Sequence, residues 1–187
     1  SNKFYVKVEV RTKTGKPVNK AKINLKIKSG LGRFNESSVR TDKNGEAITA
    51  YIPPSLTYEN VQKNELDVTL SSVIDDSNIS SSFNITLELP PVILVHGYQA
   101  DGTAFDNISN YLISKKIRTA AITYKSQEGV VASASALENF LNEQTSQLLS
   151  QGIQVKKFDL ITHSMGGLVA RYYTCSSKYP YYENVRK

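Results

Sequence analysis

The sequence predicts a chain of two domains: an all-β sandwich over residues 1–89, then an α/β domain over 90–187 with a mainly parallel sheet between two layers of helices. Three observations support this fold class. Apolar residues alternate with period two in the first part, and strand-length and helix-length apolar segments alternate in the second. Between the two parts, Pro90 and Pro91 stiffen the backbone and mark a short, rigid link.

Short alternating segments separated by turn signals define the first domain. Phe4–Val10 places apolar residues at every second position, and the pattern resumes over Ala21–Ile27 after a turn at Thr14–Pro17. Asn44-Gly45 predicts a tight hairpin that joins its two flanking strands. With further strands expected at 66–73 and 79–89, the domain has about seven short strands and no helix, as in a β-sandwich.

The second domain reads as β-α-β-α-β-α, the alternation that parallel strands require because each pair needs a crossover connection. The first strand is a fully apolar run ending in His96-Gly97, which is typical of a buried parallel strand. The remaining elements are expected as a helix at 103–115, a strand at 119–124, a helix at 133–150, a strand around 158–161 and a helix from about 168.

Ser164 is the strongest candidate for a reactive residue. It lies between the last predicted strand and the Gly166-Gly167 pair that begins the last helix, so it occupies a strand-to-helix turn. Such a turn lifts a hydroxyl clear of the sheet, and the free N–H groups of the helix start favour a negative charge beside it. A serine at this position has the surroundings of a nucleophile.

The segment Thr-His-Ser-Met-Gly-Gly, residues 162–167, resembles the nucleophile elbow of α/β-hydrolases of the lipase and esterase type. Thr162 stands where the G-x-S-x-G pattern has its first glycine. The upstream His96-Gly97-Tyr98 resembles the oxyanion loop of the same family, and the resemblance implies that the N–H groups of Tyr98 and Met165 form the oxyanion hole. Such donors typically lower a barrier by about 3 to 4 kcal/mol each. The residues that support this site are expected to be His96, Gly97, His163, Gly166 and Gly167.

The acid and the base of a serine triad are missing from this sequence. In this fold they follow the serine along the chain, but no His and no Asp follow Ser164. His96 is expected to hold the oxyanion loop, and His163 is expected to leave the turn on a different side from Ser164. We therefore expect the sequence to be part of a longer protein that supplies the triad acid and His, and to be inactive alone. Its three-stranded sheet should leave one apolar edge uncovered.

The first domain resembles the bacterial immunoglobulin-like modules of invasin and intimin type. The resemblance rests on Gly15-Lys16-Pro17-Val18 and on the Thr-Asp-x-x-Gly-x-Ala segment that begins at Thr41. It implies a spacer or surface-presentation domain that does no chemistry itself and that contacts a cell surface or polymer.

Composition excludes several classes of function. The net charge is +6, but the 23 basic and 17 acidic residues are interspersed and no basic-aromatic cluster suggests nucleic acid. No apolar run reaches the about 18 to 20 residues that a transmembrane helix needs, and the first residues lack a signal-peptide pattern. The single Cys175 excludes an internal disulfide and is expected to be a buried thiol. No metal site or cofactor motif is found in the sequence, so neither a metal nor a cofactor is expected.

These observations favour a serine hydrolase of carboxylic esters, a secreted or surface-attached bacterial lipase or esterase. The run from Ser164 to Arg171 resembles lipases and deacylases related to the glycosylphosphatidylinositol-inositol deacylase, which implies a lipid or acyl-ester substrate. Two alternatives remain. One is an inactive adhesion or binding protein with a hydrolase-like domain, and the other is an acyltransferase, which the same elbow would support.

Overall fold

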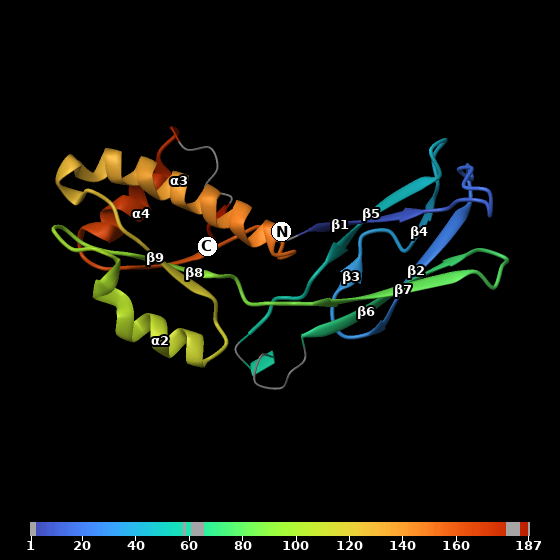
Figure 1. Cartoon of the computed structure of the whole chain (residues 1–187), viewed down its shortest axis with the longest axis horizontal. Helices are drawn as coiled ribbons and strands as arrows, with labels where there is room; N and C mark the ends of the chain where they lie inside the picture. Colours follow the sequence, from blue (N-terminus) through green and yellow to red (C-terminus); the bar gives the residue numbers. More distant parts are fainter. Residues whose placement is uncertain (1–2, 58, 61–65, 179–183, 187) are drawn as a thin grey trace. The chain divides into compact units, whose positions relative to one another are not determined.

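A computed structural model describes residues 3–57, 59–60, 66–178 and 184–186. The chain divides into two compact units, Ser1–Glu88 and Leu89–Lys187 (Figure 1). The boundary expected from the sequence, between 89 and 90, lies next to this division. Each unit has its own hydrophobic clusters, so each is described by itself.

The first unit contains two antiparallel sheets. One has the strand order β1-β5-β3 and the other the order β4-β2-β6-β7. Buried residues of both sheets pack together, since Leu25 of one sheet contacts the same cluster as Ala47 of the other. This arrangement is the two-sheet sandwich that the alternating pattern predicted. The strands are β1 (Phe4–Glu9), β2 (Lys22–Ser29), β3 (Arg33–Phe34), β4 (Ser38–Arg40), β5 (Glu46–Ile52), β6 (Asp67–Ile74) and β7 (Ser80–Thr86).

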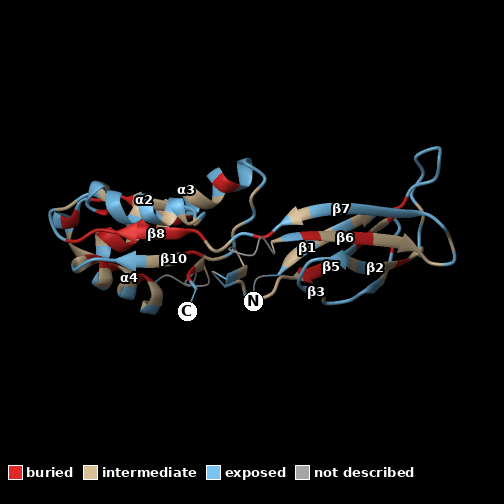
Figure 2. Ribbon diagram, turned by 90° about the horizontal axis from the view of Figure 1, so that it is seen from below, coloured by how far each residue is buried: buried red, intermediate tan, exposed pale blue. Residues whose placement is uncertain are grey.

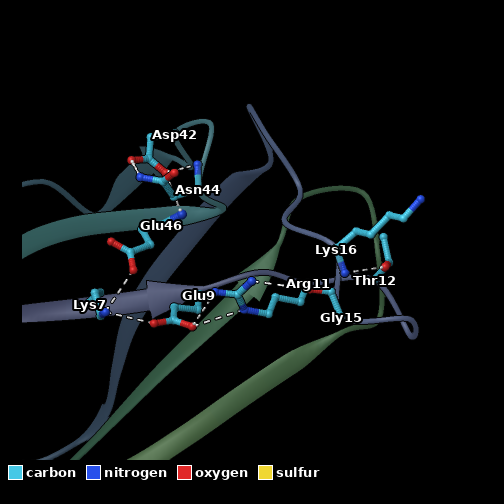
Figure 3. A network of polar contacts seen from close by, with 9 residues as sticks. All are labelled: Lys7, Glu9, Arg11, Thr12, Gly15, Lys16, Asp42, Asn44 and Glu46. Atoms are coloured by element: carbon cyan, nitrogen blue, oxygen red, sulfur yellow. Dashed lines mark hydrogen bonds and ion pairs between the residues drawn. The ribbon is translucent and has the colours of Figure 1, made fainter.

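The turn at Asp42–Gly45 corrects one expectation. It does not form a hairpin, because the strand before it, β4, pairs with β2, while the strand after it, β5, pairs with β1 and β3. The turn therefore crosses between the sheets. Asp42 accepts the main-chain N–H groups of Asn44 at 2.8 Å and Glu46 at 2.9 Å (Figure 3). Gly45 has a φ of +77°. These contacts reverse the direction of the chain, but they do not determine which strands β4 and β5 pair with. That pairing depends on the packing of the rest of the sandwich.

A second correction concerns helix in this unit, where none was expected. Glu59 and Asn60 have helical conformation. The N–H of Thr57 donates to Oδ1 of Asn60 at 2.8 Å, and the N–H of Asn60 donates to the Thr57 carbonyl at 3.1 Å. Thr and Asn are common at helix starts because their side chains satisfy the N–H groups that a first turn leaves unpaired.

The second unit is built on a parallel sheet with the order β10-β8-β9. Its elements follow the predicted order, with three strands and intervening helices in the described part of the unit. The bounds are β8 (Val92–Val95), the 3-10 helix η1 (Gly102–Phe105), α2 (Asp106–Ser114), β9 (Thr119–Ile122), the 3-10 helix η2 (Ser126–Glu128), α3 (Gly129–Ser150), β10 (Asp159–Thr162) and α4 (Met165–Cys175).

Two of the helices differ from their expected bounds. The helix expected at 103–115 is divided into η1 and α2, and the side chain of Asp101 caps η1 by accepting the N–H of Thr103 at 2.9 Å. The helix expected from Ser133 begins at Gly129. The Ser133 hydroxyl donates to the Gly129 carbonyl at 2.7 Å, one turn earlier in this helix.

β8 is the central strand and is buried along its whole length (Figure 2). Its side chains alternate between two cores, as a pleated strand requires. Ile93 and Val95 pack with residues of α3 and α4, whereas Val92 and Leu94 pack with Phe105 and with Leu112 of α2. Helices therefore cover both faces of the sheet, and the end of β8 lies between these layers.

The outer edge of β10 is partly occupied. Phe158, just before β10, forms a parallel bridge with Val185: its N–H donates to the Asn184 carbonyl at 2.7 Å, and its carbonyl accepts the N–H of Arg186 at 2.9 Å. Arg186 also forms a two-pronged ion pair with Asp159, with nitrogen–oxygen distances of 2.7 and 2.5 Å. Further along β10, Ile161 is 37% exposed, so an apolar edge residue faces solvent, as expected from a three-stranded sheet.

Candidate active site

Ser164 lies between β10 and α4 in a backbone conformation that L-residues seldom adopt. Its φ is 52° and its ψ is −123°, and the residue is exposed. This combination is favourable for glycine and strained for serine. Strain of this kind persists only where the surrounding structure enforces it, and it is common at functional sites. The sequence-predicted strand-to-helix turn is thus present, with the serine at its tip.

Gly166 allows the first turn of α4 to approach the sheet. A Cβ atom built on Gly166 would lie 2.3 Å from the carbonyl oxygen of Val95 and 2.7 Å from that of His96. Gly167 is less constrained, because the nearest atom to its built Cβ is the Thr162 hydroxyl oxygen at 3.5 Å. Thr162 stands where the G-x-S-x-G motif has its first glycine. Its side chain fits there without a clash because it faces Gly167, which has no side chain.

The loop after β8 touches the elbow through Gly97. A Cβ built on Gly97 would lie 3.0 Å from the Ser164 Cβ and 3.2 Å from both the carbonyl oxygen and the ring Nδ1 of His163. The main chains are also joined, because the N–H of His163 donates to the Val95 carbonyl at 3.0 Å. The two segments that the sequence singled out, separated by more than sixty positions along the chain, therefore meet at one place.

Two main-chain N–H groups near this contact are free. Among the described residues, neither the N–H of Tyr98 nor that of Met165 has a hydrogen-bond acceptor. Met165 is the first residue of α4, where N–H groups have no partner within the helix and the helix dipole favours negative charge. The next two N–H groups are used within the turn, by the carbonyls of His163 at 2.9 Å and Ser164 at 3.0 Å.

His96 is fully buried and both of its ring nitrogens are engaged. Nδ1 donates to the Gly97 carbonyl at 2.8 Å, and Nε2 accepts the main-chain N–H of Tyr124 at 3.2 Å. Since a carbonyl only accepts and an amide N–H only donates, these partners fix the neutral ring with its proton on Nδ1. The ring also stacks on Tyr124, with centroids 4.0 Å apart, and the Tyr124 hydroxyl donates to the His96 carbonyl at 2.5 Å. His96 thus holds the Gly97 loop and has no nitrogen available as a base.

His163 is exposed and shares with Ser164 the space beside Gly97. In the described part of the chain no hydrogen bond joins the two side chains, and the Ser164 hydroxyl has no partner there. The serine and its neighbouring N–H groups are therefore present without a base in contact with the hydroxyl.

Several residues that hold the loop after β8 were missed in the sequence. The Ser126 hydroxyl accepts the N–H of Gln99 at 2.8 Å, and the Thr123 hydroxyl accepts that of Gly102 at 3.0 Å. Asp101 accepts hydrogen bonds from both the N–H and the hydroxyl of Thr103. Both bonds lower the pKa of the Asp101 carboxyl, and the bond from the hydroxyl has the larger effect. Asp101 could have been found from its spacing to the helix start, but no sequence signal points to Ser126, Thr123 or Tyr124.

Cys175 corrects another expectation. It is exposed rather than buried. Val169 and Tyr173 form the buried side of α4, and a residue two positions after Tyr173 lies about 200° further round the helix. Over the described residues, no group of three or more His, Cys, Asp and Glu could hold a metal ion. No helix among these residues is both long and apolar enough to span a membrane.

Comparison with known proteins gives a family match and similarities to solved structures. The family described as "Putative serine esterase (DUF676)" matches residues 90–186. Two solved structures are similar to part of the chain. The "D00-D0 domain of Intimin" is 14% identical with a TM-score of 0.38, covering 46% of this chain and 39% of its own. The "D0-D1 domain of Intimin" is 16% identical with a TM-score of 0.34, covering 45% and 37%. This chain thus spans under two fifths of either intimin structure. No curated protein matches the chain.

Proposed function

We propose, from the premise that the chain belongs to the "Putative serine esterase (DUF676)" family, that it hydrolyses carboxylic esters and that Ser164 is the nucleophile. One observation carries the assignment of the residue. Ser164 is exposed in a strained turn with a φ of 52°, and its Cβ lies against the Gly97 loop. A packing serine would gain nothing from this strain, whereas a nucleophile gains access to substrate.

In the proposed reaction, the Ser164 hydroxyl oxygen attacks the ester carbonyl carbon while a base takes its proton. The carbonyl oxygen becomes an oxyanion, which the N–H groups of Tyr98 and Met165 stabilise. Collapse of this intermediate breaks the ester C–O bond and releases the alcohol, which receives the proton. Water then attacks the acyl carbon and gives up a proton to the base, the bond from that carbon to the Ser164 oxygen breaks, the serine oxygen receives the proton, and the carboxylic acid leaves.

The base and its orienting acid are proposed to lie in polypeptide outside residues 1–187. The proposal follows from the partners of the two histidines. Both ring nitrogens of His96 are engaged, and His163 has no hydrogen bond to Ser164 among the described residues. Without a base the Ser164 hydroxyl is a weak nucleophile at neutral pH, so residues 1–187 alone are expected to be nearly inactive.

The substrate is proposed to be a lipid or another acyl ester. The basis is the resemblance of the run from Ser164 to Arg171 to lipases and lipid deacylases. The first unit resembles bacterial immunoglobulin-like modules. On this basis we further propose that the enzyme is bacterial, that it is secreted or attached to the cell surface, and that the first unit holds it near a cell surface or polymer.

The test uses the full-length gene product and p-nitrophenyl esters of short and long acyl chains. Ser164→Ala is expected to lower kcat/KM by a factor of about 10⁴ or more, because the nucleophile is removed. Met165→Ala keeps the main-chain N–H and is the matched control, with activity expected to stay within about threefold. Full activity of the Ser164→Ala variant would refute the proposal. If the unmodified protein forms no product and no acyl-serine, the inactive binding protein is supported instead, and an acylated acceptor in place of free acid would identify an acyltransferase.

A further inference from the structure

β7 forms an outer edge of the first unit. It is the last strand in the order β4-β2-β6-β7 and, among the residues that the structure describes, it pairs only with β6. Six of its residues are exposed and only Ile85 is partly buried, so β7 is drawn almost entirely as exposed (Figure 2). An edge strand of this length presents a row of main-chain groups to solvent.

The hydrogen bonds at the two ends of the β6–β7 ladder show which main-chain groups face outward. The Leu87 N–H donates to the Leu66 carbonyl at 2.8 Å, and the Ile74 N–H donates to the Ile79 carbonyl at 3.0 Å. In an antiparallel ladder hydrogen-bonded pairs alternate with non-bonded pairs, so the odd-numbered residues of β7 bond to β6. The even-numbered residues therefore direct their N–H and C=O groups away from the sheet: Ser80, Ser82, Asn84 and Thr86.

The β7 edge lacks the features that usually prevent pairing. The strand has no charged residue, no proline and no glycine, and its register with β6 is continuous from Asp67↔Thr86 to Val73↔Ser80, without a bulge. Other outer strands of the unit are protected. β1 carries Lys7 and Glu9, which form ion pairs, while β3 and β4 are only two and three residues long. Charges and short length are the usual means of blocking an edge.

We propose that the β7 edge pairs with the β7 edge of a second copy of this chain, antiparallel and centred on Phe83. In this register Ser82 lies opposite Asn84 of the other copy, and Ser80 lies opposite its Thr86, so that outward-facing groups meet. The even-numbered residues would form about eight main-chain hydrogen bonds between the copies.

Three properties of β7 favour a second copy over another occupant. First, the strand is uncharged, so two copies do not repel each other there although the whole chain carries a net charge of +6. Second, the polar side chains at 80, 82, 84 and 86 meet only polar side chains in this register. Third, Phe83 is 45% exposed and lies at the centre, where the two rings would contact each other and lose solvent exposure. A seven-residue edge buries little area, so the dimer is expected to be weak.

Sedimentation equilibrium of the 187-residue chain between about 1 µM and about 1 mM tests the proposal, since weak dimers of this kind dissociate in that range. We expect a monomer–dimer equilibrium. Ser82→Pro removes one outward N–H per copy but leaves the bonds to β6 intact, and is expected to weaken dimerisation at least about tenfold. Ser82→Ala, which keeps the N–H, is expected to dimerise like the unmodified chain. Circular dichroism and thermal unfolding check that both variants are folded.

The register has its own test, which does not depend on a proline variant folding. In a Cys175→Ser background, Phe83→Cys is expected to form a disulfide-linked dimer on mild oxidation, because position 83 faces its own copy. Ser80→Cys faces position 86 and is expected to remain largely unlinked. The proposal is overturned by a chain that stays monomeric at about 1 mM, by a dimer that folded Ser82→Pro leaves unchanged, or by equal cross-linking of both cysteine variants.

Discussion

Gly166 lies directly against the carbonyl oxygen of Val95, so that a methyl group built on its α-carbon would be 2.3 Å from that oxygen. The contact joins the first turn of α4 to the end of β8, the central strand of the parallel sheet. Because the obstructing atoms belong to the main chain of a buried strand, they cannot move aside as a flexible side chain would.

Gly166→Ala is therefore expected to destabilise the second unit by about 2 to 3 kcal/mol and to displace Ser164. Gly167→Ala is the matched control, since its nearest contact is at an ordinary 3.5 Å and alanine favours a helix. That variant should be as stable as the unmodified protein, or more stable by up to about 1 kcal/mol. Urea denaturation followed by circular dichroism measures both, and equal stability of the two variants would contradict the observed packing.

The strained backbone of Ser164 predicts an unusual effect of glycine. Ser164→Gly is expected to be about 1 to 2 kcal/mol more stable than Ser164→Ala. Glycine adopts a φ of 52° without a steric penalty, whereas the Cβ of alanine causes the same penalty as that of serine. Both variants lack the hydroxyl, so the comparison isolates the backbone. Thermal unfolding would show the glycine variant melting at the higher temperature. The reverse order of melting temperatures would mean that the turn is relaxed.

The contacts of His96 predict that it is needed for stability and for the position of the Gly97 loop. His96→Phe leaves the Gly97 carbonyl and the Tyr124 N–H without partners in a buried place, which is expected to cost about 2 to 4 kcal/mol. Tyr124→Phe removes only the hydroxyl bond to the His96 carbonyl and should cost about 1 to 2 kcal/mol. Chemical denaturation gives both values. A His96→Phe variant as stable as the unmodified protein would exclude the positioning role.

Asp42 predicts a pH dependence of the first unit. Hydrogen bonds from the main-chain N–H of Glu46, and then of Asn44, hold the pKa of the Asp42 carboxyl below its usual 3.8. A lowered pKa means that the charged carboxylate stabilises the fold fully above pH 3.8, and that this contribution disappears as the pH falls through the lower pKa of the folded state.

Asp42→Asn removes the titrating group but keeps an oxygen acceptor in the turn. The melting temperature of the unmodified chain should exceed that of Asp42→Asn at about pH 6, and the difference should shrink at about pH 2.5. Other carboxylates titrate equally in both proteins, so only the difference reports on Asp42. A difference that stays the same at both pH values would show that the charge of Asp42 does not stabilise the turn.

The order of elements and the elbow could be predicted because their signals are local. The apolar run before His96 and the glycines after Ser164 determine strand, turn and helix over a few residues each. The pairing of β4 and β5 could not be predicted in this way. Turn chemistry at Asp42–Gly45 shows that the chain reverses, whereas the packing of the whole sandwich decides that the two strands enter different sheets.

Polar contacts between residues far apart in the sequence could not be predicted either. His96 and Tyr124 are 28 positions apart, and neither residue type nor spacing indicates that one ring stacks on the other. The exposure of Cys175 follows from its angle around α4, which becomes clear only when the buried side of that helix is fixed by Val169 and Tyr173.

The segment 87–91 joins β7 of the first unit directly to β8 of the second, and β8 leads into the Gly97 loop beside Ser164. Pro90 and Pro91 leave this segment little slack. If the first unit were tethered and the protein pulled, tension would travel along the covalent backbone into β8 before it reached the helices that follow. The covalent connection from the first unit therefore ends at the strand whose carboxyl end lies beside Ser164.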